Sequence, residues 1–310
     1  MKARLTAWLC FGLAASLAAP APTGGQMSGR PAMQRPGSAA VTDLDRRRLA
    51  DAADALAPQR PGTVDAYVVV AALDSDPVFA REAREAARVL ARRYDAVGRT
   101  LLLAGFDGRN IDPLPRGSLE TLETALNRVA KTMDPAEDAL ILYITAHGTP
   151  AGLAWRDQGD FLATLPPTWL DYVLKHGGLR NRLVMISPCF SGLFVPALAT
   201  AEAVVITAAA ADRTSFGCAA ENDWTFFGDA LVNHALRKNQ PLATAFGEAR
   251  TLIGNWETRG KLIPSDPQIA FGARAALWLH PIEMRMPRAP GLPVGRPATD
   301  AIDEAIAANH

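Results

Sequence analysis

Apolar and polar residues are arranged in two alternating patterns along the chain. Short continuous apolar runs are typical of strands buried on both faces, whereas apolar residues every three to four positions are typical of amphipathic helices. The apolar runs cover residues 66–73, 99–105, 139–148, 182–189 and 203–210, with a shorter strand-like piece at 267–272. The helical patterns cover residues 42–56, 76–94, 118–133, 166–178, 192–199, 224–238 and 241–256.

This alternation predicts an α/β fold with a mostly parallel, roughly six-stranded sheet sandwiched by helices. We assign a single main domain to residues 62–280. A flexible leader with one short helix precedes it at residues 22–61, and a Pro-rich tail follows at residues 281–310. The stretch around Trp155 is expected to be a looping insert.

The first residues have the pattern of a secretory signal peptide. Lys2 and Arg4 precede an apolar stretch, and small residues suited to a signal peptidase follow it. We predict a signal peptide over residues 1–21 and an exported protein, periplasmic or secreted, with no stable membrane span after cleavage. A retained N-terminal anchor is the alternative.

Composition and charge narrow the choice of partners. Hydrophobic residues make up 49% and charged residues 21%, and Lys+Arg and Asp+Glu are balanced at 32 each. This balance, with no basic cluster interleaved with aromatic residues, argues against nucleic acid or an anionic membrane surface as a partner. The sequence does not indicate an oligomeric state.

Two residues that could react follow successive strands of the expected sheet core. His147 follows the third strand and Cys189 follows the fourth. Ligands of such sheets bind beyond the carboxyl ends of the strands, and a thiol near an imidazole is a competent nucleophile. Gly148 and Gly192 would leave room for a substrate, and the N–H groups of Gly148 and Cys189 could receive an oxyanion.

Other readings of these residues remain. Taken singly, a Cys or His at a strand end is more often structural than catalytic, and only their joint occurrence favours catalysis. In an exported protein Cys189 could also form a disulfide with Cys218. A thioredoxin-type site would need a second Cys where Gly192 stands, and the five histidines have no paired zinc-ligand spacing, so we expect no metal or cofactor. His176 also precedes a glycine, but it lies at an expected helix C-terminus, where capping explains both residues.

Four stretches together resemble a known family. "YITAHG", "ISPCFSG", "ITAAAADRTSFGC" and "WTFFGDA" occur in the order found in the caspase-like cysteine peptidases, and more closely in the bacterial exported branch of the legumain-type (C13) family. The resemblance spans roughly residues 66–272. It implies a caspase-like fold and a cysteine endopeptidase acting on peptides or proteins.

The resemblance also implies residue roles. Cys189 corresponds to the nucleophile, His147 to its general acid/base, and Gly148 and Cys189 to the oxyanion hole. Cleavage after Asn or Asp is implied by matches to the substrate-binding residues of the family. These matches are Arg81, Asp229, Thr214 and Ser215.

The sequence departs from the family at two places. The Asn that orients the family's histidine is absent, and only Asp74 and Asp76 are available after the first strand. Ser187 and Phe190 replace acidic residues that flank the family's nucleophile. Two alternative functions stay open: a transpeptidase or ligase using the same acyl-enzyme, and a catalytically inactive exported binding protein of the same fold.

Overall fold

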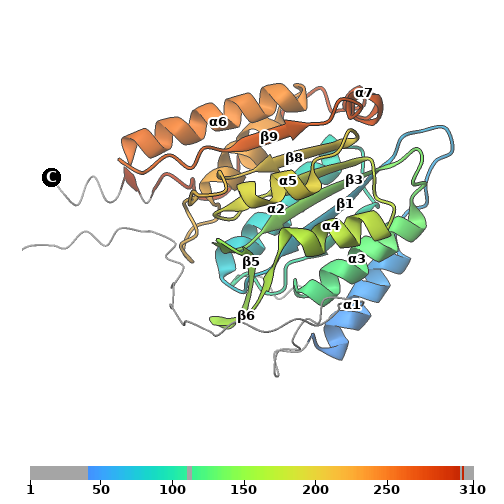
Figure 1. Cartoon of the computed structure of the whole chain (residues 1–310), viewed down its shortest axis with the longest axis horizontal. Helices are drawn as coiled ribbons and strands as arrows, with labels where there is room; N and C mark the ends of the chain where they lie inside the picture. Colours follow the sequence, from blue (N-terminus) through green and yellow to red (C-terminus); the bar gives the residue numbers. More distant parts are fainter. Residues whose placement is uncertain (1–40, 110–113, 301, 304–310) are drawn as a thin grey trace, which may run out of the picture.

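The structure is a computed structural model that describes residues 41–109, 114–300 and 302–303 (Figure 1). The predicted signal peptide and residues 22–40 of the leader lie outside the described residues. Among the residues that are described, no helix has both the length and the apolar character needed to cross a membrane.

A six-stranded sheet forms the centre of the molecule, with strand order β2-β1-β3-β7-β8-β9. Five strands are parallel, and β9 pairs antiparallel with β8 at one edge. The strands are β1 (Ala66–Ala72), β2 (Thr100–Leu103), β3 (Ala139–Thr145), β7 (Arg182–Ile186), β8 (Ala203–Thr207) and β9 (Gln268–Phe271). This confirms the predicted fold class.

Helices cover both faces of the sheet because its central strands are buried on both sides. In β1, Val68 and Val70 belong to one core and Tyr67 and Val69 to the other, as the alternation of side chains along a strand requires. The first core includes residues of α2 (Pro77–Arg93), η2 (a π-helix, Gly228–His234), η3 (Ala235–Arg237), α6 (Leu242–Arg259) and α7 (Ala276–Glu283). The second includes residues of α1 (Asp43–Asp54), α3 (Leu119–Thr132), α4 (Pro167–His176) and α5 (Val195–Leu198). The short η1 (Ser191–Phe194) precedes α5.

The stretch around Trp155 is a small antiparallel sheet, where the sequence analysis expected only a looping insert. It consists of β4 (Gly148–Thr149), β5 (Gly152–Asp157) and β6 (Asp160–Leu165). Gln158 and Gly159, with φ of 50° and 88°, form the two-residue turn between β5 and β6. A turn with positive φ at both positions matches the twist of a hairpin, but Gln-Gly is a less recognisable signal than Asn-Gly.

The Pro-rich end of the chain packs against the main domain. The boundary expected at residue 281 falls inside α7, and Ala298 and Ile302 belong to the first hydrophobic core. The main chain N–H of Arg296 donates to Asp223, and that of Ala298 donates to the carboxylate of Asp229, both at 2.8 Å. The segment is therefore anchored to the main domain at Ala298 and Ile302, while most of residues 288–297 are exposed.

Candidate active site

The pairing of β3 with β7 brings the two candidate reactive residues to one edge of the sheet. Ile144 is in register with Ile186, and the N–H of Ser187 donates to the Ile144 carbonyl at 2.9 Å. His147 and Cys189 each come three residues after this register pair. The central position of both strands (Figure 1) holds the two segments rigidly side by side.

Gly148 lies directly against the main chain of Cys189. A Cβ atom added to Gly148 would be 1.9 Å from the carbonyl oxygen of Cys189 and 3.0 Å from its nitrogen. Only glycine allows this approach. Gly192 is close-packed in the same way, since a Cβ there would lie 2.5 Å from the nitrogen of Ala211. Close packing thus explains why both positions are occupied by glycine.

Cys189 is a free thiol, so the disulfide with Cys218 that the sequence left open is not formed. The residue is only 4% exposed. Ser215 contacts the sulfur atom through its main chain: its N–H donates to Sγ at 3.2 Å, and its carbonyl oxygen lies 3.6 Å from Sγ. Burial raises the pKa of the Cys189 thiol, and the hydrogen bonds from Ser215 oppose this only in part. This environment therefore disfavours the thiolate form of Cys189.

His147 is held beside two carboxylates. Its Nε2 lies 3.3 Å from Oδ2 of Asp76 and 4.0 Å from Oδ2 of Asp74, and Phe79 packs against the imidazole ring edge-on with the centroids 5.0 Å apart. These aspartates follow β1, where the family's orienting Asn is missing. A carboxylate in this position can orient an imidazole and stabilise its protonated form.

The two aspartates have different environments. Asp74 is buried, and burial raises the pKa of its carboxyl group. Asp76 is partly exposed. The guanidinium of Arg156 lies 3.6 Å from Asp74 and 3.9 Å from Asp76.

One oxygen of each aspartate and one ring nitrogen of His147 lie within 4.8 Å of one another, a spacing that a metal ion could bridge. The cationic Arg156 already supplies positive charge to both carboxylates. The carboxylates of this cluster are therefore already paired with a cationic side chain.

Arg81 points its guanidinium at the loop that follows Ser215. It forms an ion pair with Asp223 at 3.0 Å and donates to the carbonyl oxygens of Asp107 and Asn222 and to that of Ala220. The side chains of Arg81 and Asp223 are only 9% and 11% exposed, and Arg109 also pairs with Asp223 at 2.8 Å. The carboxylate opposite Arg81 is thus Asp223, which the sequence analysis did not select.

Asp229 is located in the interior instead of facing Arg81. Its side chain accepts hydrogen bonds from Asn233 and from the N–H of Ala298, both at 2.8 Å, and His234 lies 3.5 Å away. Both carboxylate oxygens are therefore occupied within the chain, in a residue with no exposed surface. Asp229 therefore does not line a substrate pocket in this structure, in contrast to the expectation from the sequence, because its side chain is fully buried.

The two hydroxyl residues of the predicted pocket wall also differ. Ser215 is buried and contacts the thiol of Cys189, while its hydroxyl donates to the carbonyl of Ser187 at 3.3 Å. Thr214 is half-buried. Ser215 therefore supports the reactive loop itself.

Glu82 is a second residue that the sequence analysis missed. Its fully buried carboxylate accepts hydrogen bonds from the Tyr143 hydroxyl at 2.7 Å, from Ser187 at 3.2 Å, and from the N–H and hydroxyl of Thr225 at 2.8 Å each. Glu82 of α2 thus places a carboxylate beside Ser187, the residue that stands where the family has an acidic one. Among the many charges of α2, nothing in the pattern distinguishes Glu82.

Comparison with known proteins confirms the family resemblance. Residues 117–260 match the model of the Peptidase C13 family, a segment that contains His147, Cys189 and Ser215 but not Arg81. No curated protein matches the chain. A solved structure, caspase-1 from Spodoptera frugiperda, is similar at 13% identity and a TM-score of 0.44, with the likeness covering 70% of this chain and 93% of that one.

Proposed function

We propose that this chain, which matches the Peptidase C13 family over residues 117–260, is an exported cysteine endopeptidase that cleaves after Asn or Asp. The observation that carries the proposal is the meeting of the His147–Gly148 and Cys189 segments at the carboxyl ends of two central paired strands. A buried free thiol, a histidine beside carboxylates and a glycine packed on the nucleophile's main chain are the parts that acyl transfer needs.

The reaction follows from the chemistry of these groups. His147 takes the proton of the Cys189 thiol as the thiolate attacks the substrate carbonyl, and the N–H groups of Gly148 and Cys189 receive the oxyanion. The imidazolium, stabilised by Asp76, gives its proton to the leaving amine. A water molecule, deprotonated by His147, then hydrolyses the thioester and restores the thiol.

The raised pKa of Cys189 favours a particular order of events. Because burial disfavours a free thiolate, the thiolate in this proposal forms at the moment of attack. Proton transfer to His147 is then part of the acylation step.

For specificity we propose Arg81 and Asp223 as the groups that read the residue before the cut. A guanidinium beside a carboxylate offers both donors and acceptors, which suits the side-chain amide of Asn. When the substrate carries Asp, Arg81 pairs with its carboxylate. In this proposal Asp223 takes the place that the sequence assigned to Asp229.

Hydrolysis of fluorogenic peptides ending in Asn, Asp or Lys at the cut tests both parts. We expect wild-type protein to cleave the Asn and Asp peptides, and Cys189→Ala and His147→Gln to lose this activity. His176→Gln is the matched control, because His176 also precedes a glycine but stacks on Tyr172 at the end of α4. Residual cleavage by purified Cys189→Ala would reject the thiol mechanism, and equal cleavage of the Lys peptide would reject the specificity.

A further inference from the structure

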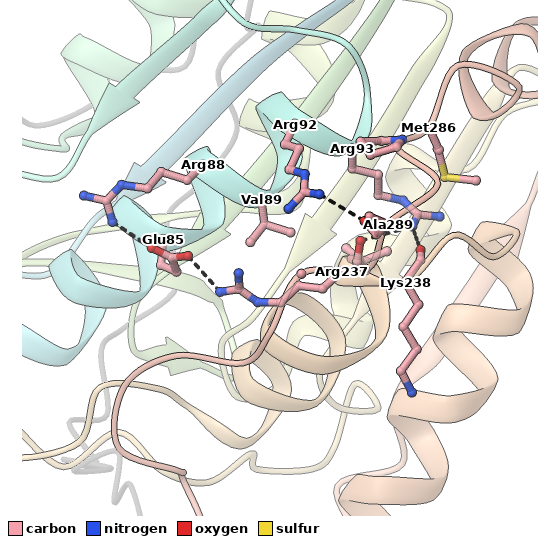
Figure 2. A pocket seen from close by; sticks show the side chains of 12 residues that line it. Glu85, Arg88, Val89, Arg92, Arg93, Arg237, Lys238, Met286 and Ala289 are labelled. Atoms are coloured by element: carbon pink, nitrogen blue, oxygen red, sulfur yellow. Dashed lines mark hydrogen bonds and ion pairs between the residues drawn. The ribbon is translucent and has the colours of Figure 1, made fainter.

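A pocket of about 230 Å³ lies between α2, η3 and the segment 286–291 (Figure 2). Four of its lining residues are arginines: Arg88, Arg92, Arg93 and Arg237. Lys238 also lines it, but its ammonium group turns away and pairs with Glu248 at 2.6 Å. None of these residues belongs to the candidate active site.

The carboxylates around the pocket are too few to balance its guanidinium groups. Glu85 is shared by two of them, lying 2.7 Å from both Arg88 and Arg237 (Figure 2). Among the described residues, the only carboxylate partner of Arg93 is Glu283, at 3.8 Å. Within the described part of the chain Arg92 has no carboxylate partner, and it donates to the carbonyl of Ala289 at 3.0 Å. In a chain with no net charge, this excess of positive charge is local.

The walls of the pocket are held in place without a ligand. Arg93 is 2% exposed and donates to the carbonyl oxygens of Leu236, Lys238 and Gln240, while its buried Nε has no hydrogen-bond partner among the residues described. The N–H of Gly291 donates to the carbonyl of Arg237 at 3.0 Å. Main-chain carbonyls therefore position Arg92 and Arg93, and Glu85 positions Arg88 and Arg237.

We propose that this pocket binds a small phosphate-type oxyanion. Arginine forks match the oxygens of a phosphoryl group in a bidentate manner, and a local excess of cations favours a multivalent anion. Pockets for drug-sized molecules have volumes of roughly 300–1,000 Å³, so a smaller pocket suits a compact ion such as phosphate or pyrophosphate. Arg92 and Arg88, which are exposed, would make the direct contacts.

Binding would connect two parts of the structure that meet near the candidate specificity residues. The pocket joins α2, which carries Arg81, to the segment that continues to Arg296 and Ala298, the residues bonded to Asp223 and Asp229. An anion bridging α2 and residues 286–291 would hold this segment in place. We therefore expect slower amide hydrogen exchange over residues 286–298 in the bound protein.

Isothermal titration calorimetry of the full-length purified protein with pyrophosphate and with inorganic phosphate tests the proposal. We expect one site with a Kd of about 1 mM or tighter for at least one of the two. Arg92→Gln should weaken binding roughly tenfold or more, as for the loss of a charge-assisted hydrogen bond. Arg47→Gln on α1 removes the same charge from an exposed helix outside the pocket and should bind like wild type.

A second variant separates shape from charge. A Cβ at Gly291 would lie 3.4 Å from Nη1 of Arg92 and 3.5 Å from Cβ of Arg237, so Gly291→Val narrows the pocket without removing an arginine. It should also weaken binding. Equal binding by wild type, Arg92→Gln and Gly291→Val would overturn the proposal, as would absence of measurable heat with both anions. The melting temperature can also be compared in the phosphate anions and in sodium acetate at the same ionic strength. An equal rise in both would overturn the proposal too, because such a rise is a general salt effect.

Discussion

Gly148→Ala tests the contact on which the candidate site depends. The new Cβ would lie 1.9 Å from the carbonyl oxygen of Cys189, 2.8 Å from its carbonyl carbon and 3.0 Å from its nitrogen. All three neighbours are main-chain atoms next to a central strand, so no side chain can turn aside. To bring the distance from the new Cβ to the Cys189 carbonyl oxygen up to 3.0 Å, the two segments would have to separate by more than about 1 Å. Overpacking of this kind costs about 1–3 kcal/mol of folding free energy.

The effect on activity should be larger than the effect on stability. A displacement of about 1 Å between reacting groups can cost roughly a hundredfold in rate. We therefore expect Gly148→Ala to unfold at lower urea concentration, with a loss of about 1–3 kcal/mol, and to lose at least about a hundredfold in kcat/KM on its preferred peptide.

Gly247→Ala is the matched control. Gly247 lies in α6 with no atom within 4 Å of the added Cβ, so the change should stabilise the protein by about 0.4–1 kcal/mol and leave activity unchanged. A Gly148→Ala protein with wild-type stability and wild-type kcat/KM would refute the contact between the two segments, and with it the basis of the site.

Three further perturbations follow from the buried groups of the site. Burial raises the pKa of Asp74 above 3.8, so the native protein binds the proton of this carboxyl group more tightly than the unfolded chain does. Stability should therefore fall as pH rises from about 3.8 through the native pKa. Asp74→Asn should remove that fall in urea titrations run at several pH values; an unchanged pH slope would contradict it. Glu82→Gln replaces a buried carboxylate that accepts four hydrogen bonds by an amide whose NH2 group would face donors. We expect the free energy of unfolding to fall by about 2–3 kcal/mol in the same titrations. A fall below about 0.5 kcal/mol would argue against the network. Because burial also raises the pKa of Cys189 above 9.0, alkylation at residue 189 by iodoacetamide, followed by peptide mass spectrometry, should still accelerate past pH 9.0, whereas a plateau below pH 8 would indicate a preformed thiolate.

The fold was predictable from the sequence because each central strand is a continuous apolar run. The expected strands at 66–73, 139–148 and 203–210 contain the observed β1, β3 and β8. The expected helix at 224–238 corresponds to the π-helix η2 and the short η3, because the 3.6-residue period of apolar positions does not reveal how the hydrogen bonds are arranged.

The candidate site was predictable only where it is attached to strands. His147 and Cys189 occupy strand ends, whose neighbours follow from the sheet topology. Asp223 and Asp229 lie after a loop of more than ten residues, and their orientation depends on the partners Arg81 and Ala298, which are far away in the sequence. A motif match could select Asp229, but only the three-dimensional structure shows that it faces inward.

His147 and Cys189 lie just beyond the ends of β3 and β7, and this position bears on how the protein should lose its proposed activity on heating. These strands are the third and fourth of six, and each is bonded on both sides. Local openings of a protein start at edges and loops, whereas central strands separate only when the whole domain unfolds. The two strands that precede His147 and Cys189 thus have no local route of separation. Inactivation should coincide with cooperative melting, so any ligand or substitution that raises the melting temperature should extend the working temperature of the enzyme by the same amount.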